Sequence, residues 1–188
     1  MPNQDTSSLA QLLATRSTRR GDFTLASGRK SSLYIDARLT TMSPDGLALI
    51  GPLALATLRK ASWPVTAVGG LTLGADPIAY AISYASAASP PTLRAFTVRK
   101  EAKGHGTGKL IEGPFRAGDV VAVVEDVITS GASALRAVEA VRDAGGEVAG
   151  VLALVDREEG GDETLRAAGL PVLSLVRASD ILSFLPRS

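Results

Sequence analysis

The sequence predicts an α/β protein with a central, mainly parallel sheet flanked by helices. The first observation is an alternation after Pro64, where short apolar runs are followed by segments with helical periodicity. Strands that alternate with helices are typical of parallel sheets covered on both faces. The second observation is that 188 residues, 45% of them hydrophobic and 21% charged, suit a globular domain with a proper core. No repeat or linker divides the chain, so residues 1–188 are expected to form a single domain.

Four elements are expected before Pro64: a helix, two short strands and a second helix, over residues 7–18, 22–26, 32–37 and 44–60. Three leucines share one face of the first helix. A serine–glycine turn separates the two strands. The segment Ser43-Pro44-Asp45 starts the second helix, because it combines a capping side chain, a proline in the first turn and an acid near the positive end of the helix dipole.

After Pro64 the alternation predicts five strands, over residues 65–70, 92–98, 119–125, 147–156 and 171–176. It also predicts four helices, over residues 75–87, 132–144, 162–169 and 179–185. Residues 99–119 fit neither period. They form a long, basic, glycine-rich connection, and connections of that length are usually functional or disordered.

The composition excludes several classes of function. Twenty Lys and Arg residues nearly cancel nineteen Asp and Glu, and a net charge of +1 creates no field that would attract nucleic acid or a membrane. The chain has no cysteine and one histidine, His105, which excludes disulfides, thiol catalysis and multi-histidine metal sites. A metal would be held by oxygen atoms or arrive with a substrate, which favours Mg²⁺.

The apolar segments do not predict export or membrane insertion. The amino terminus, MPNQDTSS, lacks the basic and apolar regions of a signal peptide. The longest apolar stretch, residues 46–58, falls short of the about 20 residues that a membrane span needs. A cytoplasmic protein is expected.

The segment VVAVVEDVITSGAS (120–133) predicts a ligand site. Glu125 and Asp126 lie at the carboxyl end of an expected strand, where open parallel sheets bind ligands. We expect the chain to leave the strand at this pair, so that both side chains turn toward one site. Thr129-Ser130-Gly131 then leads into a helix at about Ala132, whose free N–H groups can receive a phosphate. A ribose 5-phosphate would satisfy both halves, and the alternative is a capped helix start with two solvated acids.

A second candidate site is the basic connection. Five basic side chains crowd into eleven residues against one acid: Arg99, Lys100, Lys103, His105 and Lys109. Three glycines among them make the segment mobile, and a polyanion would order it. The ordinary pKa of histidine, about 6.5, lets His105 share a proton near neutrality. The alternative is a solvated, charged loop.

Arg157 is the third candidate. It follows the strand expected over 147–156 and so lies at the same edge of the sheet as Glu125. A guanidinium group offers a bidentate match to a carboxylate. The alternative is a surface arginine paired with Glu158 or Glu159.

Two common nucleotide-binding motifs are absent. The segment GGLTLGA (69–75) is not G-x-G-x-x-G. The segment GHGTGK (104–109) is followed by leucine, and a lysine stands at position 103, where a phosphate-binding loop of the Walker type has its first glycine. The sequence therefore supports neither a dinucleotide-binding fold nor a nucleoside triphosphatase.

With its apolar strand, two acids and T-x-G, the 120–133 segment resembles the phosphoribosyl-diphosphate motif of the type I phosphoribosyltransferases. The wider pattern resembles the orotate phosphoribosyltransferases of that family. The matching pieces occur in the family's order: FTLASGRKSSLYIDAR (23–38), GGLTLGADPIA (69–79), VRKEAKGHGTGKLIEG (98–113), VVEDVITSGAS (123–133) and VDREEGG (155–161). The motif alone marks the superfamily, whereas the R-K-x-x-K-x-H-G loop followed by I-E-G is more specific to the orotate enzymes.

The resemblance implies the type I phosphoribosyltransferase fold, with a small hood formed largely by residues 1–40 and a mobile catalytic loop at 99–112. It implies transfer of the phosphoribosyl group from phosphoribosyl diphosphate to orotate, giving orotidine 5′-phosphate and diphosphate. Mg²⁺ would be carried mainly by the diphosphate, with no metal-ligating residues assigned. The implied assembly is a homodimer with shared active sites, without nucleic-acid or membrane partners.

Matching positions also imply residue roles. The phosphoribosyl-diphosphate site would comprise Arg99, Lys100, Lys103, His105, Glu125, Asp126, Val127, Ile128, Thr129, Ser130, Gly131, Ala132 and Ser133. The catalytic residues would be Lys103, His105 and Arg99, which would serve the partner's site, while Lys100 serves its own or a shared one. Thr129 and Arg157 would bind orotate. Tyr34 and Ile35 lie where the family covers the base, although Tyr34 would also suit an ordinary core.

Two positions depart from the family pattern, and two other functions stay open. Ala26 and Leu73 stand where some bacterial relatives have a substrate-contacting lysine, so we expect no diphosphate contact from these two side chains. One alternative is a phosphoribosyltransferase for another base, which would not need Arg157 or the loop pattern at 98–113. The other is a regulator that senses phosphoribosyl diphosphate.

Overall fold

A computed structural model describes residues 4–24, 30–101 and 109–186. Its centre is a six-stranded sheet with the strand order β5-β4-β3-β6-β7-β8. Neighbouring strands pair in parallel except at the edge, where β5 runs antiparallel to β4. The strands are β3 (Ala67–Leu71), β4 (Arg94–Val98), β5 (Ile111–Glu112), β6 (Val120–Ile128), β7 (Glu147–Asp156) and β8 (Val172–Arg177). The predicted α/β class is confirmed.

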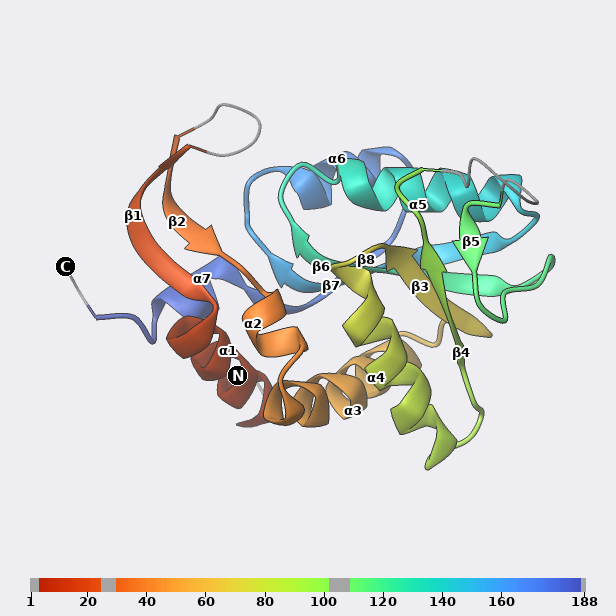
Figure 1. Ribbon diagram of the computed structural model, residues 1–188, viewed down its shortest axis with the longest axis horizontal. Helices are drawn as coiled ribbons and strands as arrows, with labels where there is room; N and C mark the ends of the chain where they lie inside the picture. The colour runs from red at the N-terminus through yellow and green to blue at the C-terminus, as the bar shows by residue number, and fades with distance from the viewer. Residues whose placement is uncertain (1–3, 25–29, 102–108, 187–188) are drawn as a thin grey trace.

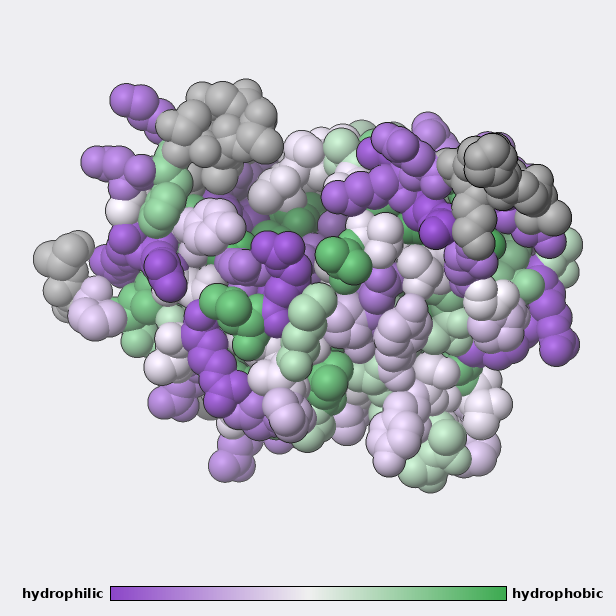
Figure 2. All heavy atoms as spheres, in the orientation of Figure 1, coloured by the Kyte–Doolittle hydropathy of each residue, from purple (hydrophilic) through white to green (hydrophobic). Residues whose placement is uncertain are grey.

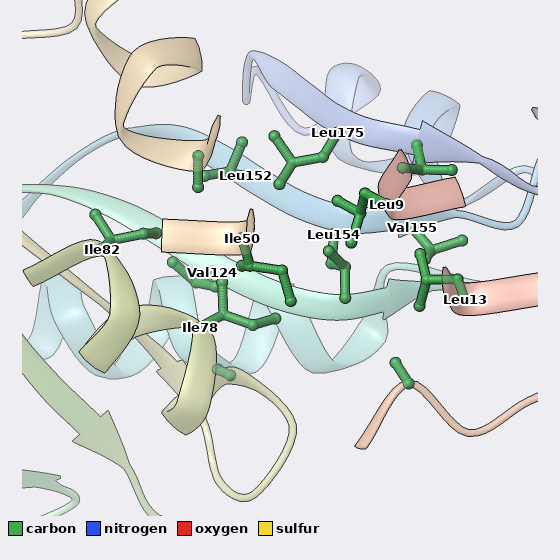
Figure 3. Packing of buried hydrophobic residues seen from close by; sticks show 14 of the residues in the cluster. Leu9, Leu13, Ile50, Ile78, Ile82, Val124, Leu152, Leu154, Val155 and Leu175 are labelled. Carbon is green, nitrogen blue, oxygen red and sulfur yellow. The ribbon is translucent and has the colours of Figure 1, made fainter. Parts of the chain in front are cut away.

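Helices cover both faces of this sheet, as predicted (Figure 1). One face carries α5 (Ala132–Asp143) and α6 (Gly161–Ala167), and the other carries α1 (Gln4–Arg16), α3 (Pro44–Lys60), α4 (Ala75–Ala87) and α7 (Ala178–Leu182). Alternate residues of a strand enter the two cores, because successive side chains point to opposite faces. Val123 packs on the α5 side, and Val124 packs with Ile50 and Ile78 on the other side (Figure 3).

The strands β1 (Thr18–Thr24) and β2 (Lys30–Ile35) form a separate antiparallel sheet that stands away from the main one (Figure 1). The first helix ends two residues earlier than predicted, and β1 begins at Thr18. The hydroxyl of Thr18 donates to the carbonyl of Leu13, which ends the helix, and the buried hydroxyls of Ser17 and Thr40 lie 2.7 Å apart. Thr40 belongs to α2 (Arg38–Thr41), a single turn that the sequence pattern did not predict.

Two predictions about the strands are wrong. The chain does not leave β6 at the acidic pair, because the strand continues to Ile128 and pairs with β7 as far as Asp156. Consequently, Glu125 and Asp126 face opposite sides of the sheet. Residues 99–119 also contain β5, which is two residues long and therefore too short to produce a recognisable period.

The predicted start of α3 is confirmed. Ser43 is its N-cap, the backbone N–H of Gly46 donates to the Ser43 hydroxyl at 3.2 Å, and Pro44 opens the helix. In the described part of the chain, no helix combines the length and apolar content that crossing a membrane requires.

Candidate active site

The acidic pair lies near the carboxyl end of β6. Asp126 faces the side of α4, and its Oδ1 accepts a hydrogen bond from the N–H of Val127 at 2.9 Å. Gly74, which precedes α4, lies directly against this carboxylate: a Cβ added at Gly74 would stand 2.5 Å from the Asp126 Cγ. A larger residue at this position would displace the carboxylate.

Glu125 faces the opposite side, toward the loop that precedes α5. Burial, reinforced by the charge of Asp126, raises the pKa of Glu125 to about 8. Its Oε2 is buried and accepts no hydrogen bond from the described residues. Burial also raises the pKa of Asp126. Hydrogen bonds from backbone N–H groups and the charge of Arg38 lower this pKa, but burial has the larger effect. Glu125 therefore offers an unsatisfied oxygen to an incoming hydroxyl group.

The loop after β6 has the geometry of an anion receptor. Gly131 is the N-cap of α5 with φ of 81°, a left-handed conformation that favours glycine, and it has no side chain that could cap the helix. The N–H of Ala132 makes a long hydrogen bond of 3.5 Å to the Ser130 hydroxyl, and the next N–H groups of the first turn can receive a ligand. A hollow of about 20 Å³ is lined by Glu125 and residues 127–134, which brings the predicted phosphate loop and one of the two acids together.

Arg157 lies beside this loop. Of the alternative interpretation, the pairing with Glu159 is confirmed, but the arginine is buried and does not lie on the surface. Its backbone N–H donates to the carbonyl of Ile128 at 3.0 Å, which makes it a neighbour of Thr129. The side chain is 4% exposed. Its Nη2 donates to Glu159 at 2.5 Å and to the carbonyl of Leu33 in β2 at 3.2 Å. Glu158 has another function, since its Oε2 accepts from the N–H of Ser179 at the start of α7.

The start of the basic loop follows β4 at the same edge of the sheet. The backbone N–H of Arg99 donates to Leu110, and its guanidinium lies 3.7 Å from Glu112. The carbonyl of Lys100 accepts from Arg136 of α5 at 2.8 Å. These bonds fix both ends of the loop near α5. Lys103 and His105 lie outside the described residues, as does Ala26.

The paired strands β1 and β2 supply the remaining candidates. Ile35 is buried, whereas Tyr34 is 42% exposed and its ring lies 5.4 Å from that of Phe23. Arg38 was not predicted as a site residue. It binds Asp36 through two hydrogen bonds of 2.8 and 3.0 Å, and its charge reaches Asp126. Nothing in the spacing of the sequence indicated this approach, because it depends on the unpredicted α2.

A broad apolar groove lies next to the turn that contains Gly74. It has a volume of about 1520 Å³ and lies between α3 and α4, with Leu73 at its border. Tyr80, Tyr84 and Met42 line it and are 52%, 85% and 53% exposed. Figure 2 shows this region, in the lower half of the molecule, as mostly pale and green surface with few strongly hydrophilic residues. An apolar surface of this extent is typical of an interaction site.

Comparison with known proteins gives consistent results. No protein-family model matches the chain. An orotate phosphoribosyltransferase from Aquifex aeolicus is 49% identical over 177 residues, which cover 93% of this chain and 96% of that protein. One from Corynebacterium glutamicum is 49% identical over 175 residues, which cover 92% of this chain and 91% of that protein.

Solved structures agree with these relatives. The orotate phosphoribosyltransferase of Mycobacterium tuberculosis H37Rv in complex with inorganic phosphate matches with a TM-score of 0.82 and 43% identity, over 95% of this chain and 99% of that one. The same enzyme in complex with phosphoribosyl diphosphate matches with a TM-score of 0.77 and 43% identity, over 94% and 98% of the two chains.

Proposed function

Because the chain belongs to the orotate phosphoribosyltransferase family, we infer that it transfers the phosphoribosyl group of phosphoribosyl diphosphate to orotate. The products are orotidine 5′-phosphate and diphosphate. The observation that carries this inference is the edge of the sheet at β6 and β7. Glu125 and the loop before α5 line one hollow there, Asp126 follows Glu125 in β6, and the backbone N–H of the buried Arg157 donates to the carbonyl of Ile128.

Each part of this edge suits one part of the substrates. Glu125 and Asp126 accept the ribose hydroxyls, and residues 129–133 hold the 5-phosphate through N–H and hydroxyl donors. The guanidinium of Arg157 binds the carboxylate of orotate, with Thr129 beside it. The C–O bond to diphosphate breaks at the anomeric carbon while a ring nitrogen of orotate bonds to the same carbon. Positioning of two reactants is the main requirement of such a displacement.

The leaving diphosphate needs positive charge, since its negative charge grows as the bond breaks. In this proposal the charge comes from Arg99, Lys100, Lys103 and His105 of the 99–112 loop. Mg²⁺ arrives with the diphosphate and neutralises part of its charge. Carboxylate oxygens, such as those of Asp126, are of the hard type that this ion prefers.

The groove between α3 and α4 supports a homodimer, with a second copy of the chain as its occupant. Leu73 and Asp76 line the groove and flank Gly74, which packs against Asp126. A second subunit bound in the groove would therefore lie next to the diphosphate end of the site. The 99–112 loop of that second subunit could then supply positive charge to this site. Residues 1–40 would form the hood over orotate, and the cytoplasmic location stays a prediction.

Neither alternative function is favoured. The relatives that match most of this chain are named orotate phosphoribosyltransferases, and neither alternative would require the loop pattern at 98–113 together with an arginine at position 157. The test is a choice of acceptor: the purified protein is given phosphoribosyl diphosphate and Mg²⁺ with orotate, uracil or adenine, and nucleotide products are identified by mass spectrometry. Orotidine 5′-phosphate alone is expected. Formation of uridine or adenosine monophosphate instead would overturn the proposal.

A further inference from the structure

A chain of hydrogen bonds runs from the groove to the turn beside the acidic pair. At its centre is Asp76, in the first turn of α4. Its Oδ2 accepts from the hydroxyl of Thr72 at 2.7 Å, and its Oδ1 accepts from the hydroxyl of Thr97 at 2.8 Å. The hydroxyl of Tyr80 lies 2.8 Å from that of Thr97. Four side chains from β4, α4 and the β3–α4 turn are thereby joined.

The donors in this chain can be assigned from chemistry. An ionised carboxylate only accepts hydrogen bonds, so Thr72 and Thr97 both donate to Asp76. The single proton of the Thr97 hydroxyl is then used, and Tyr80 must donate to Thr97. Removing the Tyr80 hydroxyl would therefore remove the hydrogen bond that the Thr97 oxygen accepts. Thr97 itself is hydrogen-bonded to the Asp76 carboxylate, so the loss would act next to that carboxylate.

The network ends at the wall of the proposed ribose site. Thr72 is held twice, by its side chain at Asp76 and by its backbone N–H, which donates to Val98 at 2.8 Å. Two residues later, Gly74 lies against the carboxylate of Asp126 so closely that no side chain fits between them. A shift of the turn therefore displaces either Gly74 or Asp126. A displacement of about 1 Å at a reacting centre is costly to catalysis.

We propose that Asp76 is a positioning residue for phosphoribosyl diphosphate, which holds the Thr72–Gly74 turn against Asp126, and that Thr97 and Tyr80 extend this support to the groove. The inference rests on the proposed function, because it takes the substrate and the second subunit from it. The ring of Tyr80 is 52% exposed in the groove, and a second subunit would cover it. Dimerisation would thus stabilise the turn, and the affinity for phosphoribosyl diphosphate would depend on it.

Three variants test the network at increasing distance from the turn: Asp76→Ala, Thr97→Val and Tyr80→Phe. The last two nearly keep the shape of the side chain, so the fold is preserved. The control is Tyr84→Phe, which removes a hydroxyl one turn further along α4, in the same groove, from a side chain that is 85% exposed. The KM values for both substrates are measured, with dissociation constants for phosphoribosyl diphosphate from calorimetry and melting temperatures.

Thr97→Val is expected to raise the KM and the dissociation constant for phosphoribosyl diphosphate by about five-fold, the usual effect of one hydrogen bond. Asp76→Ala should raise both constants for phosphoribosyl diphosphate more than Thr97→Val does, and Tyr80→Phe should raise them less. In all three variants the KM for orotate should change by less than about two-fold. The control Tyr84→Phe should behave like wild type. Equal changes for both substrates would indicate a merely structural effect and overturn the inference, as would unchanged binding in Asp76→Ala. If the wild-type protein bound phosphoribosyl diphosphate without consuming orotate, the proposed function would fail, and calorimetry would still decide the role of Asp76.

Discussion

Replacing Arg157 with alanine separates the two substrates that the site is proposed to bind. Orotate has a carboxylate for this guanidinium to bind, whereas phosphoribosyl diphosphate is assigned to other residues. A hydrogen bond to a charged group contributes about 1.5–3 kcal/mol, which corresponds to roughly 10- to 100-fold. We therefore expect the KM for orotate to rise by that factor, with the KM for phosphoribosyl diphosphate nearly unchanged.

The structure also predicts what Arg157→Ala does to stability. The arginine side chain is 4% exposed and its partner, Glu159, is 23% exposed, so Glu159 regains part of its hydration when the arginine is removed. The loss should stay below the about 3–5 kcal/mol that breaking a fully buried ion pair costs. Melting temperatures check that the variant is folded. Arg166→Ala is the matched control, since the exposed Arg166 side chain pairs with Asp162 on α6 and its loss should change neither KM.

Steady-state kinetics with each substrate varied in turn is the assay. The assignment of Arg157 to orotate would be wrong if the two KM values rose equally, or if a folded Arg157→Ala variant bound orotate as well as wild type does. Either outcome would remove Arg157 from the orotate site and leave its bonds to Glu159 and Leu33 as its whole function.

Three other predictions concern the acidic pair and the loop. Asp126→Asn keeps the size of the side chain but removes a charged acceptor, so calorimetry should show weaker binding of phosphoribosyl diphosphate with an unchanged melting temperature; unchanged affinity would contradict the ribose assignment. Because the pKa of Glu125 is raised to about 8 in the folded protein, above its ordinary 4.5, the folded state binds this proton more tightly than the unfolded state. The melting temperature of the ligand-free protein should therefore fall as the pH rises from about 5 to about 8, and Glu125→Gln should flatten this fall; an equal slope in the variant would count against it. Lys103→Ala should lower kcat by about 100-fold, and mixing it with Asp126→Asn should restore activity toward about a quarter of wild type if the loop crosses between subunits, because half of the dimers are mixed and each has one intact site. A flat result, with subunit exchange verified by mass spectrometry, would exclude the crossing.

Long, regular elements could be predicted from the sequence because a single local signal determines each of them. The helix at 75–87 and the strand at 147–156 have the predicted bounds, and the Ser43 cap begins α3 as expected. The shape of the loop before α5 was predictable for the same reason. Its hydroxyls, its glycine and the start of α5 follow one another in the chain, and local backbone geometry brings them together.

Features that depend on tertiary contacts were not predictable. The point at which β6 ends is set by its pairing with β7. This pairing continues past Glu125 as far as Ile128 and Asp156, so β6 continues as well. The alternation of side chains then places the two acids on opposite faces, which the sequence alone did not require. Arg38 reaches Asp126 through a four-residue helix, and Asp76 joins residues from three elements. Contacts of this kind leave no periodic pattern in the sequence by which they could be predicted.

Transfer of the phosphoribosyl group to orotate can be tested by following orotate consumption and diphosphate release in one reaction. The purified protein is mixed with orotate, phosphoribosyl diphosphate and Mg²⁺, and the loss of orotate absorbance is measured together with the release of diphosphate. One orotate should be consumed for each diphosphate released, and no diphosphate should be released when orotate is omitted. Constant orotate absorbance in a protein that binds phosphoribosyl diphosphate would contradict the proposed transfer.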